Sequence, residues 1–269
     1  MPPAVRAPST PHVRAPRRKR GSDVDLGEVG AGERRHPWEV VRAEFFRAVL
    51  QRNRLLPTPA IVDVGAGDGW LAYQLLDDLP PDARVVCWDI NYTDADLALT
   101  ADPRVSWTRT PPDAPAPLAL LLDVVEHVED DHAFLSDAVG RCVAPGGHAL
   151  ISVPAWPSLF SEHDVFLHHH RRYRPQALRA LARSVGLEPV EQGGLFASLI
   201  PVRGATVLRE RLTASRTQPQ GAGHWGGGPR ATQAVGAALR LDAAVGQWSA
   251  RHRVPTPGLS AWLLARRPW

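Results

Sequence analysis

The sequence has 269 residues, of which 44% are hydrophobic and 22% are charged, with a formal net charge of +3 at pH 7. This length and composition are typical of one large globular domain and exclude a chain that is disordered throughout. Its two cysteines, Cys87 and Cys142, are too few for a disulfide framework and lie in no zinc-binding spacing. They predict a protein of a reducing, cytoplasmic compartment.

The basic charge is concentrated at the N-terminus. Residues 1–35 carry eight basic and four acidic side chains, a net charge of +4 that leaves the rest of the chain near neutrality. These residues are rich in Pro, Arg and Gly and have almost no apolar periodicity, so a disordered tail is expected. The distribution argues against nucleic acid as a partner. No stretch has the composition of a membrane span or a secretory signal, which leaves at most a weak peripheral contact with a membrane.

From residue 36 to 269 the chain alternates helical and extended patterns. A first helix is expected from Pro37, a favoured first-turn residue. Strands are expected at 60–64, 84–89, 105–108, 118–123, 148–153, from 187, and at 260–265, with helices at 70–76, before the Pro145-Gly146-Gly147 segment, and at 175–185. This alternation predicts an α/β fold with a mostly parallel central sheet and helices on both faces.

The region 195–258 breaks this rhythm and is predicted to be variable and helical. Residues 195–212 show a helical pattern interrupted by Pro201 and Gly204. A polar, Gly-rich loop over 213–230 and an Ala-rich helix over 231–250 are expected to follow.

The most informative segment follows the first expected strand and runs from Asp63 to Trp70. It reads Asp-Val-Gly-Ala-Gly-Asp-Gly-Trp, with glycines at alternate positions. A dinucleotide-binding loop needs a third glycine at the position of Trp70, where the helix packs closely on the strand. Asp89 ends the second strand, at the same edge of the sheet. A carboxylate there can accept hydrogen bonds from two ribose hydroxyls.

This glycine segment resembles motif I of the class I S-adenosylmethionine-dependent methyltransferases. The run Asp123-Val-Val-Glu126-His127-Val, followed by an acidic helix start and Ala-Pro-Gly-Gly, is similar to the type 11/12 group. The resemblance covers residues 36–195. It implies the Rossmann-like class I methyltransferase fold and S-adenosylmethionine as cofactor.

The resemblance also implies which residues contact the cofactor. Asp63 is expected near its ammonium group, Asp89 at its ribose, and Arg42, in a His-x-Trp…Arg pattern, at its carboxylate or on the helix surface. A partner for the adenine amino group stays open among Thr108, Thr110 and Asp113. The full predicted cofactor set is Arg42, Asp63, Gly65, Ala66, Gly67, Asp89, Ile90 and Leu122.

A metal site is a minority hypothesis. In related ubiquinone-biosynthesis O-methyltransferases, a Glu-x-x-Glu-His segment holds a divalent metal, and Asp123, Glu126 and His127 match its positions. Mg²⁺ there would lower the pKa of an acceptor hydroxyl. The favoured interpretation is a metal-free turn that packs against the cofactor.

The acceptor-side loop is expected at 155–175. Its Ser-Glu-His163-Asp…His169-His-Arg-Arg172-Tyr173 arrangement resembles the acceptor loop of some type 11/12 enzymes. His163, His169 and Tyr173 are the predicted catalytic residues. His163 is favoured as general base because Asp164 is adjacent in sequence.

Together these features predict methyl transfer to a small-molecule or lipid-like acceptor, at a hydroxyl oxygen, with transfer to nitrogen or carbon left open. Two alternatives remain. One is a non-catalytic module that binds S-adenosylmethionine or a partner, and the other is a nicotinamide-dependent oxidoreductase, which the position of Trp70 disfavours.

Overall fold

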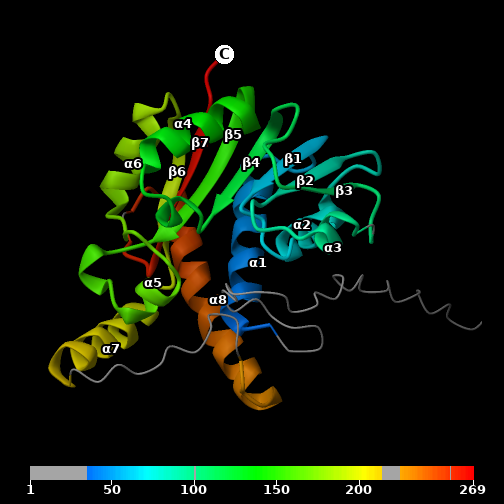
Figure 1. Ribbon diagram of the computed structural model, residues 1–269. Helices are drawn as coiled ribbons and strands as arrows, with labels where there is room; N and C mark the ends of the chain where they lie inside the picture. The colour runs from blue at the N-terminus through cyan, green and yellow to red at the C-terminus, as the bar shows by residue number, and fades with distance from the viewer. Residues whose placement is uncertain (1–34, 100, 214–224, 255) are drawn as a thin grey trace, which may run out of the picture.

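A computed structural model describes residues 35–99, 101–213, 225–254 and 256–269. The predicted tail therefore lies outside the described residues except for Arg35, and so does most of the predicted 213–230 loop. Seven strands form one sheet in the order β3-β2-β1-β4-β5-β7-β6 (Figure 1). The strands are β1 (Ala60–Val64), β2 (Arg84–Trp88), β3 (Val105–Thr108), β4 (Ala116–Leu122), β5 (Val143–Pro154), β6 (Glu188–Leu195) and β7 (Ser260–Arg266).

The sheet is parallel except at one strand. The pairs from β3 to β5 all run parallel, and β7 is antiparallel to both β5 and β6. Strand β1 lies between β2 and β4, so the chain leaves it in opposite directions along the sheet. In open α/β sheets the ligand crevice lies at such a switch point, beyond the carboxyl ends of the strands.

Helices cover both faces of the sheet, as predicted (Figure 1). The helices are α1 (Pro37–Arg52), α2 (Trp70–Leu75), α3 (Asp94–Leu97), α4 (Asp131–Cys142), α5 (Glu162–Phe166), α6 (Pro175–Ser184), α7 (Leu199–Thr213) and α8 (Pro229–Arg251). Residues of α1, α2 and α8 form one core cluster with the sheet, and residues of α4 and α6 form the other. Strand β4 is buried against both clusters, which explains its nearly continuous apolar sequence.

Helix α1 shows how the sequence builds this packing. It begins at Pro37, and the Nδ1 atom of His36 accepts a hydrogen bond from the Trp38 N–H at 3.2 Å. Phe45 and Phe46, adjacent in sequence, are both almost fully buried, and the Phe45 ring contacts Trp262 of β7 edge to face at 5.5 Å. Helix α1 is thereby fixed against the sheet, and its Arg42 reaches the carboxyl ends of β4 and β5.

Two expectations about the elements were wrong. Strand β5 starts at Val143, before the predicted Pro-Gly-Gly turn, because Gly146 (φ 76°) bends the strand and its N–H bonds the Arg267 carbonyl at 2.9 Å. Helix α7 continues without a break through Pro201 and Gly204. Pro201 lies in the first helical turn, where a missing N–H leaves no intrahelical hydrogen bond unmade. The short helix α5 was not expected.

Among the described residues, none of the helices is both long and apolar enough to cross a membrane.

Candidate functional site

The glycine loop between β1 and α2 is built for close approach to its backbone. Gly65 and Gly67 have φ values of 64° and 55°, a left-handed conformation that glycine adopts without strain. A Cβ on Gly65 would lie 2.6 Å from a methyl carbon of Val124. The Gly65 N–H donates to the Trp88 carbonyl at 2.7 Å, which ties the loop to the end of β2. The half-buried Ala66 lies between the two glycines.

Asp89 closes this loop from the neighbouring strand. Its carboxylate accepts hydrogen bonds from the N–H of Gly67 at 3.1 Å and from the N–H of Asn91 at 2.9 Å. Each carboxylate oxygen retains a further acceptor site. Ile90, the next residue, is 75% exposed and can offer an apolar surface, whereas Leu122 is half-buried at the end of β4. The predicted cofactor residues of β2 and the glycine loop therefore lie together.

Asp63 is a buried carboxyl at the base of this loop. Burial raises its pKa to about 7, the nearby Arg42 opposes this rise, and the charge of Asp89 adds to it. A buried carboxylate of this kind is stabilised by a cation, such as the ammonium end of an amino acid.

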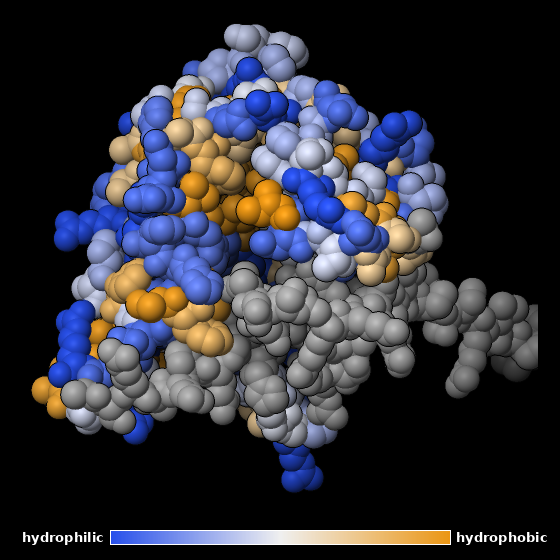
Figure 2. Space-filling model, in the orientation of Figure 1, coloured by the Kyte–Doolittle hydropathy of each residue, from blue (hydrophilic) through white to orange (hydrophobic). Residues whose placement is uncertain are grey.

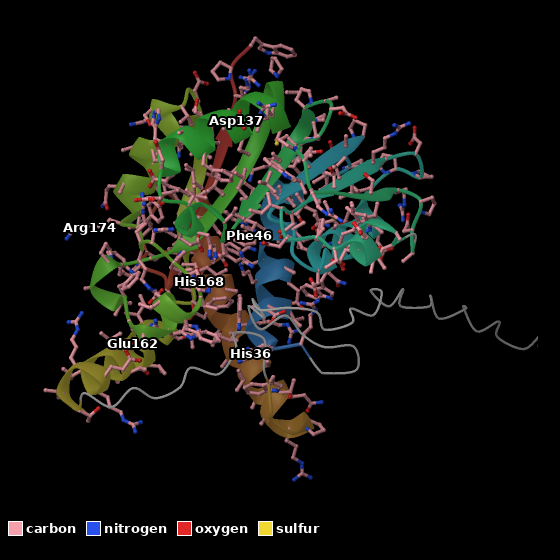
Figure 3. The ribbon with its side chains drawn as sticks, in the orientation of Figure 1. His36, Phe46, Asp137, Glu162, His168 and Arg174 are labelled. Atoms are coloured by element: carbon pink, nitrogen blue, oxygen red, sulfur yellow. The ribbon has the colours of Figure 1, made fainter. Side chains whose placement is uncertain are left out.

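Arg42 reaches from α1 to the ends of β4 and β5. Its guanidinium forms an ion pair with Asp123 at 2.7 Å and a hydrogen bond with Ser152 Oγ at 3.1 Å. Its Nε atom is buried without a hydrogen-bond partner among the described residues. The side chain lies 5.5 Å from the ring centre of Phe46, which is labelled in Figure 3. Arg42 thus points inward. The interpretation of Arg42 as an arginine on the helix surface is therefore wrong.

The loop after β3 gives less information about an adenine contact. The Thr108 hydroxyl donates to the Thr110 carbonyl at 3.0 Å, and Trp88 Nε1 donates to the Arg109 carbonyl at 3.2 Å. These contacts hold the loop in place without singling out an adenine partner.

The acceptor-side loop is organised around Asp164, a fully buried carboxylate of α5. It accepts hydrogen bonds from His169 Nδ1 at 3.0 Å, from Arg172 Nε at 2.8 Å and from Arg203 at 2.7 Å. Burial alone would raise its pKa, but the His169 hydrogen bond and the charges of Arg172 and Arg203 outweigh it and lower the pKa well below its usual range. Figure 3 labels Glu162 and His168 on this loop.

Asp164 therefore orients His169. The prediction from sequence that Asp164 assists His163, its neighbour in the chain, was wrong. Adjacent helical residues point in different directions. His168 adopts φ 58°, and the chain turns back so that the His169 N–H bonds the Asp164 carbonyl at 2.8 Å. Burial and the charge of Arg203 lower the pKa of His163 to about 4, so its imidazole is neutral at pH 7.

Tyr173, the third predicted catalytic residue, lies in the core. Its hydroxyl donates to Asp131 at 2.8 Å, and its backbone N–H donates to the Pro154 carbonyl at 2.9 Å. Burial and the Asp131 carboxylate raise its pKa far above the usual range. These contacts hold the end of the acceptor loop against β5 and α4.

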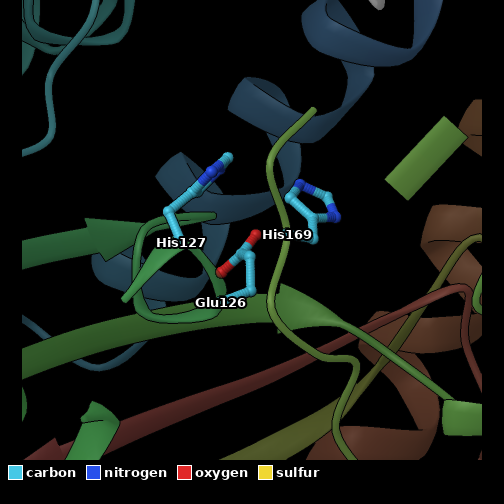
Figure 4. Close-up of side chains that lie close together, drawn as sticks. All are labelled: Glu126, His127 and His169. Carbon is cyan, nitrogen blue, oxygen red and sulfur yellow. The ribbon is translucent and has the colours of Figure 1, made fainter. Parts of the chain in front are cut away.

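A second group of polar side chains combines Glu126, His127 and His169 (Figure 4). One ligand atom from each lies within 4.8 Å of the other two, and the imidazole rings meet edge to face at 4.7 Å. Burial and the charge of Asp123 raise the pKa of Glu126 well above its usual range. Burial, with the neighbouring His169, lowers the pKa of His127 to about 4. Asp123 is not in this group, because its carboxylate contacts Arg42 and Ser152.

Sequence reasoning missed Arg203 and Ser152. Arg203 of α7 reaches Asp164, and its only signal was a cation in the apolar first half of that helix. Ser152, fully buried on β5, joins Arg42 and Asp123, and its signal was a hydroxyl within an apolar strand.

The face of the molecule shown in Figure 2 has a hollow at its centre, where apolar residues are surrounded by polar ones. The sequence family described as "Methyltransferase domain" matches residues 38–192, more than half of the chain. No curated protein matches the sequence.

Two solved structures have a similar fold. One, assigned as a sarcosine dimethylglycine methyltransferase from Galdieria sulphuraria, is 14% identical, with 88% of this chain and 95% of that chain covered and a TM-score of 0.53. The other, the [4+2]-cyclase SpnF, is 16% identical, with 84% and 81% covered and a TM-score of 0.50. At these identities the likeness establishes the fold alone.

Proposed function

The chain belongs to the methyltransferase-domain family of class I S-adenosylmethionine-dependent proteins, and we propose that it methylates a hydroxyl oxygen of a small-molecule or lipid-like acceptor. The observation that carries this proposal is the hydrogen bond at 3.1 Å between the Gly67 N–H and the Asp89 carboxylate. It joins the glycine loop to an acid at the switch point of the sheet, where the ribose of a nucleoside cofactor is recognised.

The residues around this contact fit S-adenosylmethionine. Gly65 leaves the backbone open where a Cβ would collide with Val124, Gly67 adopts a left-handed φ of 55°, and Asp63 offers a buried carboxylate for the ammonium group. Arg42 is the candidate partner of the methionine carboxylate, and its buried Nε atom has no other partner among the described residues. Asp89 accepts from the ribose hydroxyls. The bound cofactor supplies an electrophilic methyl group on a sulfonium.

The acceptor side then needs to align a hydroxyl and remove its proton. When bound, the cofactor would supply its methyl carbon to the acceptor oxygen, and the electrons of the broken carbon–sulfur bond would stay on sulfur. The hydroxyl proton passes to His163, whose imidazole is neutral at pH 7. Asp164 holds His169 in position, and Tyr173 fixes the end of the loop, so we assign both His169 and Tyr173 positioning roles.

Exposed apolar side chains on the acceptor side support a lipid-like or apolar acceptor. Val165 and Phe166 of α5 are 55% and 39% exposed, and Val202 and Leu208 of α7 are 64% and 58% exposed. Helices α5 and α7 lie side by side (Figure 1), linked by the contact of Arg203 with Asp164. Exposed apolar side chains on these two neighbouring helices suit an acceptor with a hydrocarbon portion.

Calorimetric titration with S-adenosylmethionine, S-adenosylhomocysteine and NADH tests the cofactor. We expect micromolar binding of the two adenosyl ligands and none of NADH. Asp89→Ala should weaken binding at least tenfold, because each hydrogen bond to a charged group contributes about 1.5–3 kcal/mol. The matched control is Asp137→Ala on the exposed face of α4, which should bind normally. Absence of adenosyl-ligand binding by folded protein would overturn the proposal.

Transfer of a labelled methyl group to a panel of hydroxylated acceptors tests the reaction. His163→Gln should reduce transfer and leave cofactor affinity unchanged. Cofactor binding without transfer to any acceptor would favour the alternative of a non-catalytic binding module, and the cyclase among the similar folds shows that the fold does not fix the reaction.

A further inference from the structure

We propose that Glu126, His127 and His169 form a binding site for a divalent transition-metal ion such as Zn²⁺. The three side chains come from two separate segments. Glu126 and His127 belong to the 3₁₀ helix Val125–His127 after β4, and His169 lies in the loop after α5. Figure 4 shows the Glu126 carboxylate between the two imidazole rings.

Glu126 is the strongest indication of a cation. Its side chain is fully buried, and neither carboxylate oxygen has a hydrogen-bond partner in the part of the chain that the structure describes. Leaving a carboxylate buried and unpaired is costly, and buried charges in proteins are normally paired or bind a metal. Among the described residues, the candidate metal-binding group that includes Glu126 contains His127 and His169.

His169 is already oriented as a ligand. Its Nδ1 atom hydrogen-bonds to Asp164 at 3.0 Å, which leaves Nε2 as the nitrogen available for coordination. Metal-binding histidines typically bond a carboxylate through the other ring nitrogen, which fixes the tautomer and the direction of the ring. The buried Asp164, itself held by Arg172 and Arg203, provides that carboxylate.

The donor set indicates the type of metal. Two imidazoles and one carboxylate are the protein ligands of open zinc sites, in which a fourth position stays free. Mg²⁺ prefers oxygen ligands and keeps several waters, so these residues do not suit it. Ligand atoms about 2.1 Å from a tetrahedral ion lie about 3.4 Å apart. The group, now within 4.8 Å, would therefore contract by about 1 Å when the ion binds.

The position of the three ligands suggests a role for the ion in binding the acceptor, and this role rests on the proposed function. Asp123, two residues before Val125, contacts Arg42 of the cofactor side, and His169 belongs to the acceptor loop. The free coordination position would hold the acceptor oxygen between the Arg42 side and the acceptor loop. The ion would then lower the pKa of the acceptor hydroxyl. His163 would remain the proton acceptor.

Cobalt titration of the full-length, chelator-treated chain without a histidine tag tests the site. We expect one Co²⁺ per chain with visible absorption bands, displaced by Zn²⁺, and a thermal midpoint raised by Zn²⁺. Glu126→Gln and His169→Gln should each weaken Co²⁺ binding at least about 100-fold, because loss of a partner outside the ligand shell alone costs 10–100-fold. The matched control is His170→Gln, the exposed neighbour of His169 and not a member of the group.

Glu126→Gln keeps the shape of the side chain and replaces a buried, unpaired carboxyl group with an amide that cannot ionise. The variant should therefore fold, with a higher thermal midpoint than the metal-free parent, and Zn²⁺ should no longer raise it. Equal loss of binding in His170→Gln and His169→Gln would overturn the proposal, because it would mean that the exposed histidine run chelates the ion. Absence of binding by folded parent protein would also overturn it. Adenosyl-ligand binding, measured separately, tests the proposed function, so the two can fail independently.

Discussion

Asp63 offers the sharpest test of the energetics of the cofactor site. Its carboxyl is 4% exposed, and burial raises its pKa from 3.8 to about 7. At 1.36 kcal/mol per pKa unit, this rise corresponds to about 4 kcal/mol. The folded protein holds the Asp63 proton at a pH where the unfolded chain has lost it. The contribution to stability is therefore fully present below pH 4 and is lost as the pH rises through 7.

The variant Asp63→Asn removes this titration and keeps the size of the side chain. We expect its free energy of unfolding, relative to that of the parent, to increase by about 3 kcal/mol between pH 5 and pH 8. Urea unfolding at the two pH values measures this double difference. The contribution of the other buried carboxyl, Glu126, is present in both proteins and largely cancels.

Asp137→Asn serves as the control, because it makes the same chemical change at a side chain that is 54% exposed on α4. If the free energy of unfolding of Asp63→Asn changed with pH as much as that of the parent, the raised pKa assigned to the buried Asp63 carboxyl would be refuted. The same variant should bind S-adenosylmethionine weakly at pH 8, since an amide cannot balance the charge of its ammonium group.

Three further results are expected. Gly65→Ala should abolish adenosyl-ligand binding and lower the thermal midpoint, because its Cβ would lie 2.6 Å from a valine methyl carbon; Gly140→Ala, with open space around it in α4, should raise stability by about 0.5–1 kcal/mol. Asp164→Asn should lower the free energy of unfolding, measured in urea, by about 3–5 kcal/mol, because it leaves the buried guanidinium groups of Arg172 and Arg203 without a negatively charged partner. Burial raises the thiol pKa of Cys87 and brings that of Cys142 to about 12, so a thiol reagent at pH 8 should label both only after denaturation.

The fold was predictable because each of its signals is local. The alternation of strands and helices gave the α/β class, and the bounds of β1 and β3 matched residue by residue. The errors came where tertiary contacts decide the backbone. The β5 strand extends back through Gly146 because the last residues of the chain pair with it, and no local pattern reports that pairing.

The proximity of the proposed cofactor residues Gly65, Gly67 and Asp89 was also predictable, for a related reason. Gly65, Gly67 and Asp89 lie at the ends of two adjacent parallel strands, so their positions in the sequence fix their neighbourhood in space. Trp70 at the position of a third glycine correctly argued against a dinucleotide loop. These residues contact one another through the backbone, and backbone geometry follows from the strand–loop–helix pattern.

The acceptor half depends on side-chain contacts between distant segments, and there the sequence misled. Asp164 is adjacent to His163 in sequence, yet its hydrogen bonds go to His169, Arg172 and Arg203. The last of these comes from α7, 39 residues further along the chain. A carboxylate that carries three such contacts sets the position of the loop and of α7 together. Changes in α7 should therefore alter the acceptor side and leave the Asp89 contact, and with it cofactor affinity, unaffected.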